Sequence, residues 1–165
     1  MADGIPNSIF LQLDGLTGSS TEDKHKEWIE LVTVAWGGHN PTSRGTDGNV
    51  KAGSVSFQGL SCVKTVDATT PVLLDKMANG QAIPKGKIEI CKQDKGMTPI
   101  LTYELTTVFV AAISLDAVSG DASVQNENLM LDFREVKVIY QKQNPDGTDG
   151  AKSEFAWNIG QNKQV

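Results

Sequence analysis

The sequence has few cationic side chains, and arginine is especially scarce. Among its 165 residues, 15 are Lys or Arg and 20 are Asp or Glu, so the formal net charge is −5 at pH 7. The guanidinium groups come from Arg44 and Arg134 alone. Because a surface that neutralises phosphates needs clustered Lys and Arg, we expect no nucleic-acid partner.

Long apolar segments are also missing. No stretch approaches the ~20 consecutive apolar residues that cross a bilayer as a helix, so membrane insertion is not expected. The first residues, MADGIPNSIF, contain neither the basic nor the apolar segment of a secretory signal peptide. We therefore expect a protein that stays in the cytoplasm or leaves the cell by a route without a cleaved signal.

Cysteine and histidine are too few for a disulfide scaffold or an obvious metal site. Cys62 and Cys91 lie in apolar, strand-like segments, where two buried reduced thiols are the favoured interpretation and a single disulfide bridge the less favoured one. His25 and His39 have no second His, Cys or carboxylate at the spacing of known metal motifs. We predict no bound metal, and we predict that the polar run around His25, residues 18–26, is a solvated loop without chemistry.

Catalytic motifs are absent as well. The sequence has no G-x-S-x-G elbow, no G-K-[ST] after a Gly-rich loop and no G-x-G-x-x-G before a helix. The segment NPDGTDG, residues 144–150, lacks the ligand alternation and closing Glu of a Ca²⁺ loop, so a hairpin turn is predicted there. We therefore predict no enzyme activity, no catalytic residue and no cofactor.

The sequence does contain a series of segments with period-2 alternation, the pattern of half-buried strands. Phase changes at Gly59 and near Arg134 indicate bulges or bends. A different pattern, with Pro71 after Thr70 as N-cap and Gly80 as terminator, predicts a short α-helix at about residues 71–79. We predict one domain, residues 1–165, of mainly all-β class: a two-sheet antiparallel small β-barrel or sandwich of about eight or nine strands with that helix.

Residues 28–36 and the segment after them are the most distinctive part of this pattern. Alternation through residues 28–36 leaves both faces largely apolar, so we expect both faces to be covered. Residues 37–53 contain five glycines and one proline and show no apolar periodicity. Because loops of that length in a compact domain are usually functional or disordered, this segment is the first functional candidate.

Several motifs, in a fixed order along the chain, carry a resemblance to a known family. The segment KHKEWIE leads into VAWG, a Gly-rich loop and SVSF, and these are followed by VDATTPVLL, LDFREVKVIY and FAWNIGQN. Over essentially residues 5–162 the sequence resembles the Hcp (haemolysin-coregulated protein) family, the tube protein of bacterial type VI secretion systems. The V-D-x-[ST]-[ST]-P helix start and the terminal W-N-I-x-Q-N are strong indicators in combination.

The resemblance implies a structural role and a set of partners. It implies a homohexameric ring, assembled in the cytoplasm, whose copies stack into a tube inside a contractile sheath under a VgrG-type spike. It also implies secretion toward a target cell and small effector cargo held in the lumen. Because the sequence ends directly after the family core, no fused toxin domain is expected.

The same resemblance implies where the assembly contacts lie. The Gly-rich loop would meet the adjacent ring, through His39, Asn40, Arg44, Asp47 and Asn49. The strand of residues 28–36 would face the lumen or a neighbouring subunit, through Trp28, Glu30, Thr33 and Ala35. Ala35 offers cargo no hydrogen bond, so the strand does not identify an effector. Six copies at −5 carry −30 per ring, so we expect added salt to relieve self-repulsion and tighten stacking.

Two other classes remain open on the residues alone. A carbohydrate-binding β-sandwich module needs an exposed aromatic platform, whereas the ten aromatic residues fall mostly in alternating strand phases. A small hydrolase needs a nucleophile or metal set, and the sequence contains none that is recognisable.

Overall fold

The computed structural model describes residues 7–94, 96–120 and 125–165. Along these residues the elements are β1 (Asn7–Leu13), β2 (Ile29–Ala35), β3 (Gly38–His39), β4 (Thr42–Arg44), β5 (Val50–Ala52), β6 (Ser56–Phe57), β7 (Leu60–Thr65), α1 (Thr70–Ala78), β8 (Ile83–Gln93), β9 (Met97–Leu115), β10 (Asn126–Gln143), β11 (Asp149–Asn158) and β12 (Lys163–Gln164). Within this described part of the chain, no helix has the length and apolar character needed to cross a membrane.

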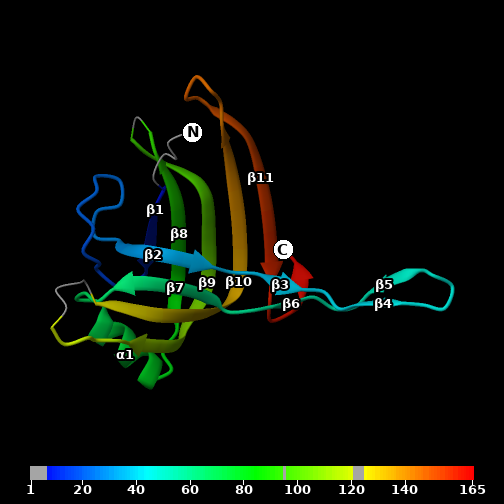
Figure 1. Ribbon diagram of the computed structural model, residues 1–165, viewed down its shortest axis with the longest axis horizontal. Helices are drawn as coiled ribbons and strands as arrows, with labels where there is room; N and C mark the ends of the chain where they lie inside the picture. Colours follow the sequence, from blue (N-terminus) through cyan, green and yellow to red (C-terminus); the bar gives the residue numbers. More distant parts are fainter. Residues whose placement is uncertain (1–6, 95, 121–124) are drawn as a thin grey trace.

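Eight of the strands form one antiparallel sheet that closes on itself. Their order is β12-β11-β10-β7-β2-β1-β8-β9, and an additional pairing joins β9 to β10. The length of β10 allows this closure, because its first residues pair with β7, its later residues pair with β11, and β9 runs along the whole strand. Beyond the closed part, β11 and β12 extend the sheet on one side (Figure 1). The predicted mainly all-β antiparallel class is confirmed.

One hydrophobic core joins β1, β2, β7, β8, β9, β10 and α1. Leu11, Leu60 and Leu131 from the sheet and Leu73 from the helix have no exposed surface. The helix lies across one end of the closed sheet (Figure 1). Because a helix of nine residues is not stable alone in water, its packing on the sheet is what holds it in place.

The observed helix is displaced by one residue from the predicted bounds at each end. Thr69 is the N-cap residue instead of Thr70, and it makes no side-chain capping hydrogen bond. The Thr70 hydroxyl oxygen accepts from Lys64 Nζ and Asp67 N, while its O–H donates to Glu127 Oε2 at 2.8 Å. At the other end Gly80 has a φ of +60°, which favours glycine, and its N–H donates to Met77 O at 3.2 Å. Gly80 therefore terminates the helix as the sequence predicts.

A buried ionic network fastens the start of this helix to the sheet. Lys64 of β7 and Glu127 of β10 are cross-strand partners, and neither side chain is exposed. Lys64 Nζ lies 2.6 Å from Glu127 Oε1 and 2.9 Å from Asp67 Oδ1, and it also donates to Thr65 O and Thr70 Oγ1. The V-D-x-T-T-P motif therefore supplies hydrogen-bond partners to a buried lysine, in addition to starting the helix.

The structure agrees with the predicted change of strand phase at Gly59 and differs in part from the one predicted near Arg134. The chain breaks between β6 and β7 at Gly59, as expected. In β10 the buried positions change phase between Phe133 and Val136, where the strand leaves β7 and begins to pair with β11. The register shift against β9 lies earlier, between Met130 and Leu131. The bend near Arg134 is therefore present, whereas the bulge is displaced toward the start of the strand.

Candidate assembly surfaces

Residues 37–58 leave the body of the protein as a two-stranded arm (Figure 1). At its base β3 pairs with β6 through Gly38 and Phe57, and farther out β4 pairs with β5 through Ser43 and Lys51. Residues 37–53, described from the sequence as a loop, contain the paired strands β3, β4 and β5. A ribbon that buries neither face needs no apolar alternation, so the sequence carries no period-2 signal for it.

Local hydrogen bonds fix the turn at the tip of the arm. Gly45 N donates to Asn49 O at 2.9 Å, and Gly48, which closes the turn, has a φ of +80° that favours glycine. The Asp47 carboxylate accepts from the side chain and the backbone of Asn49, and these hydrogen bonds lower the pKa of Asp47. The arm therefore ends in a defined polar turn.

The arm makes no packed layer with the body. Every residue of β4 and β5 is exposed, and all five residues predicted to contact the next ring lie on the arm and are exposed: His39, Asn40, Arg44, Asp47 and Asn49. An isolated two-stranded ribbon is only marginally stable in water. The arm therefore has the properties of a segment that is completed by contact with another molecule.

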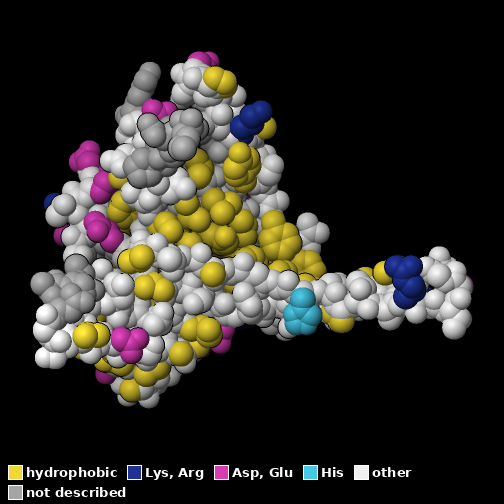
Figure 2. All heavy atoms as spheres, viewed as in Figure 1, with side chains coloured by type: hydrophobic (Ala, Val, Ile, Leu, Met, Phe, Trp, Pro, Cys, Tyr) yellow, Lys and Arg dark blue, Asp and Glu magenta, His cyan; other side chains and the backbone are white. Residues whose placement is uncertain are grey.

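An aromatic patch lies where the arm meets the body. We define it as Trp36, Phe57, Tyr103, Phe155 and Trp157. The Trp36 and Phe57 rings are stacked at 5.0 Å, and Phe57 lies 6.1 Å from both Phe155 and Trp157. Phe155 remains 39% exposed. Figure 2 shows hydrophobic side chains gathered in the centre of this face and continuing to the base of the arm. The other four residues are half-buried, and Trp36, Tyr103 and Trp157 also pack against the core. Partly exposed apolar surface of this kind marks interaction sites.

Sequence reasoning missed the aromatic patch, because it placed most of the aromatic residues in alternating strand phases and expected no exposed aromatic platform. β11 lies outside the closed part of the sheet, so part of its apolar face is left uncovered. The sequence gives no signal that β11 lies outside the closed part of the sheet, because closure depends on the pairing of β9 with β10.

A bulge in β2 sets which of its residues face outward. Pairing with β7 shifts register between Leu31 and Thr33. Before the shift Ile29 and Leu31 are buried, and after it Val34 packs on the core instead. Three of the predicted lumen or interface residues consequently lie exposed on one outward face: Glu30, Thr33 and Ala35.

The expectation that both faces of residues 28–36 are covered is wrong for the single chain. The outward face of β2 is open, and Val32 is 54% exposed. Trp28, the fourth predicted residue of this group, precedes β2 and is half-buried with its ring edge-on to His25 at 4.9 Å.

Residues 18–26 form a loop that is mostly exposed, as predicted, but the prediction is wrong for Ser20 and His25, which are buried. His25 is 1% exposed and stacks on Phe10 of β1 at 4.2 Å. Its Nδ1 lies 2.5 Å from Glu22 Oε2, and its Nε2 lies 2.7 Å from Glu89 Oε2. The charged sequence misleads at His25, because this ring lies between Glu22 and, on β8, Glu89 and packs against Phe10 and Trp28.

The electrostatics of this region follow from its burial and its hydrogen bonds. Burial raises the pKa of Glu89, but hydrogen bonds and charge from Lys87 and His25 outweigh burial and lower the pKa overall. Burial, reinforced by the negative charges of Glu89 and Glu22, raises the pKa of the Cys91 thiol to about 12. Cys62 and Cys91 are both buried free thiols, as the sequence predicts.

The fold and surfaces define a class of protein: a small closed antiparallel sheet with a projecting arm, a partly exposed aromatic patch and an exposed strand face. The family described as "Type VI secretion system effector, Hcp" matches residues 10–140. Protein hcp1 of Pseudomonas aeruginosa is 32% identical over 159 residues, which cover 95% of this chain and 98% of that relative.

Solved structures agree with the sequence match. A structure described as that of a type six secretion system protein has a TM-score of 0.90 at 27% identity, covering 97% of this chain and 100% of that one. Hcp1 from Salmonella typhimurium has a TM-score of 0.79 at 26% identity, covering 96% and 99% of the two chains.

The chain belongs to the Hcp family of type VI secretion proteins. The resemblance in its sequence is thereby confirmed. Hcp proteins are secreted structural proteins, so the chain is not an enzyme. The carbohydrate-binding alternative receives no support.

Proposed function

We propose that six copies of this chain close into a ring, and that the rings stack into the inner tube of a type VI secretion system. The observation that carries the proposal is the exposed arm with the aromatic patch at its base, two surfaces that the described part of the chain leaves at least partly uncovered. A ring is a head-to-tail interface whose rotation closes, so each subunit must present two different surfaces. The arm and the body supply surfaces of different character.

In this proposal the arm is the contact between stacked rings. Its defined tip presents Arg44, Asp47 and Asn49 to solvent, with both signs of charge and an amide. Polar residues of that kind suit a contact that forms and separates reversibly, because water hydrates them when the rings are apart. His39 and Asn40, nearer the base, would complete the contact.

The outward face of β2 is proposed as a lumen or subunit-interface surface. Three side chains on one exposed face are short or charged: Glu30, Thr33 and Ala35. Such side chains suit the wall of a lumen along which water and cargo move. Trp28 contributes less to this face, because its ring is half-buried against His25.

The proposal includes the route and the partners. The rings would assemble in the cytoplasm, inside a contractile sheath and below a VgrG-type spike, and leave the cell without a cleaved signal. Small effectors would travel in the lumen. The family membership of the chain supports this reading.

Ring stacking is expected to tighten as salt is added. A ring of six chains at −5 each carries −30, and screening at higher ionic strength weakens the repulsion between stacked rings. Sedimentation velocity across a series of NaCl concentrations measures this directly. The stacked fraction should rise with salt. Dissociation of stacks into single rings on salt addition would instead show that charge attraction holds them together.

A further inference from the structure

The outer face of β8 carries a group of side chains that has no part in the proposed function of the arm. Lys87, Glu89 and Cys91 alternate along this strand and therefore share a face. The neighbouring strand β1 places Phe10 opposite Glu89. The segment before β2 covers this face and carries His25 onto it.

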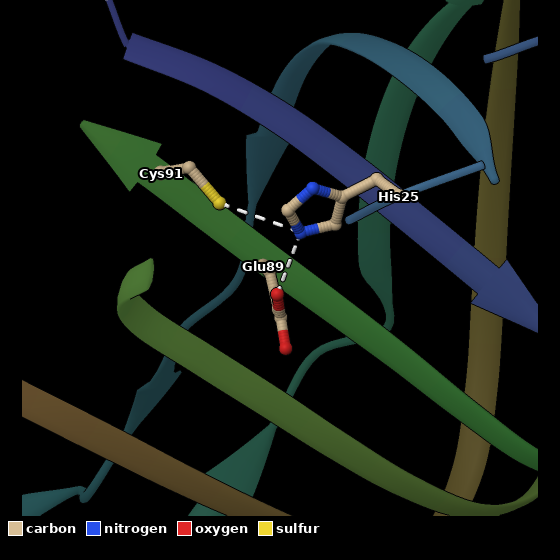
Figure 3. Close-up of side chains that lie close together, drawn as sticks. All are labelled: His25, Glu89 and Cys91. Atoms are coloured by element: carbon tan, nitrogen blue, oxygen red, sulfur yellow. Dashed lines mark hydrogen bonds and ion pairs between the residues drawn. The ribbon is translucent and has the colours of Figure 1, made fainter. Parts of the chain in front are cut away.

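Three side chains with metal-ligating atoms meet under this cover (Figure 3). The ligand atoms of His25, Glu89 and Cys91 all lie within 4.8 Å of one another, and all three residues are buried. His25 Nε2 is 2.7 Å from Glu89 Oε2 and 3.7 Å from Cys91 Sγ. In a tetrahedral zinc site a sulfur and a nitrogen ligand lie about 3.5 Å apart. The Cys91–His25 separation already fits that geometry.

A supporting shell orients two of these ligands. Glu22 Oε2 binds the other ring nitrogen of His25 at 2.5 Å, and Lys87 Nζ holds the second oxygen of Glu89 at 2.8 Å. Metal-binding histidines almost always donate their second N–H to a carboxylate, carbonyl or water. Glu22 fulfils that role here, which leaves Nε2 as the ligand atom and Glu89 Oε2 directed at it.

We propose that His25 Nε2, Glu89 Oε2 and Cys91 Sγ bind one divalent transition-metal ion, Zn²⁺ in the first place, with a water molecule as fourth ligand. Thiolate, imidazole and carboxylate are the ligands that zinc uses. To admit the ion, Glu89 Oε2 must move from 2.7 Å to about 3.3 Å from Nε2, the separation of two light ligands around zinc. The site would fasten the segment of residues 18–28 to β8.

The binding step balances as an exchange of protons for metal. Without metal, the hydrogen bond of 2.7 Å between His25 Nε2 and Glu89 Oε2 holds one proton, and the free thiol of Cys91 holds another. Zinc forms bonds to Nε2 and to Sγ, and the N–H and S–H protons leave to the buffer. One Zn²⁺ therefore replaces two H⁺ and the net charge of the cluster does not change.

The test uses the full chain under a thiol-free reductant. Cobalt(II) should give thiolate-to-metal charge-transfer absorption at one ion per chain, and Zn²⁺ should displace it. Cys91→Ser should abolish that absorption, and Cys91→Ser and Glu89→Gln should each weaken zinc binding by at least roughly tenfold, the size of effect seen when a metal site loses a supporting group. Cys62→Ser removes the other buried thiol, which the cluster does not include, and should bind as the parent chain does.

Titration calorimetry in buffers of different ionisation enthalpy supplies an independent readout. About two protons should be released per zinc ion when ring and thiol are both ligands. At one fixed zinc concentration, binding should also raise the unfolding temperature of the parent chain by more than that of Cys91→Ser. Absence of saturable binding at one ion per chain overturns the proposal. Unchanged affinity in both Cys91→Ser and Glu89→Gln overturns it too, whether or not rings form.

Discussion

Replacement of Lys64 by methionine is expected to lower the free energy of unfolding by about 3–5 kcal/mol, the cost typical of breaking a buried ion pair on one side. The substitution keeps most of the side-chain volume but leaves Glu127, whose side chain has no exposed surface, without a counter-charge. It also removes the lysine contacts to Asp67 and Thr70 at the start of α1.

Urea denaturation followed by tryptophan fluorescence, at one fixed protomer concentration, measures this loss. The double variant Lys64→Met/Glu127→Leu should regain most of the stability, because replacing both partners of a buried pair by apolar side chains is often neutral. The matched control is Lys152→Met, which breaks an exposed pair with Glu154 and should leave the midpoint unchanged. A Lys64→Met variant within about 1 kcal/mol of the parent chain, the range of an exposed pair, would show that the network contributes little.

Removal of the arm is expected to abolish stacking and leave single rings. Residues 40–55 can be replaced by Asn-Gly, which joins β3 to β6 by a two-residue turn that suits antiparallel pairing and keeps the pair of His39 with Ser56. The deleted residues contribute nothing to the core, so circular dichroism and the unfolding midpoint should stay close to those of the full chain and serve as the folding control.

Sedimentation velocity at high salt, where the full chain should stack most, measures the effect of arm removal. Loss of the stacked species with retention of the ring would support the role of the arm. Stacks of unchanged mass would place the contact between rings elsewhere on the molecule. A monomeric variant would assign the arm to the interface between subunits of one ring.

The sequence pattern predicted those elements whose conformation depends on residues that are neighbours in the sequence. Alternation located the strands of the closed sheet, and Pro71 with Gly80 located the helix to within one residue. Within the segment 144–150, residues 144–148 join β10 to β11 as a hairpin turn, as the composition predicts, and β11 begins at Asp149. In each case residues that are neighbours in the sequence determine the local conformation.

The remaining features depend on contacts between residues that are far apart in the sequence, and local patterns do not predict such contacts. His25 meets Glu89 and Cys91 across separations of 64 and 66 residues, and the charged residues around it give the opposite signal. Lys64 lies in the buried phase of β7 with Leu60 and Cys62, which was the one available sign of a buried charge. The bulge that brings Glu30, Thr33 and Ala35 to one face appears only once β2 pairs with β7.

The central claim, that this chain is a ring-forming subunit, is tested most directly by its mass in solution. Native mass spectrometry at moderate ionic strength should give a dominant species of six chains of 17.7 kDa, with negative-stain images showing rings from the same sample. A species of one chain at every protein concentration and salt concentration tried would contradict the account.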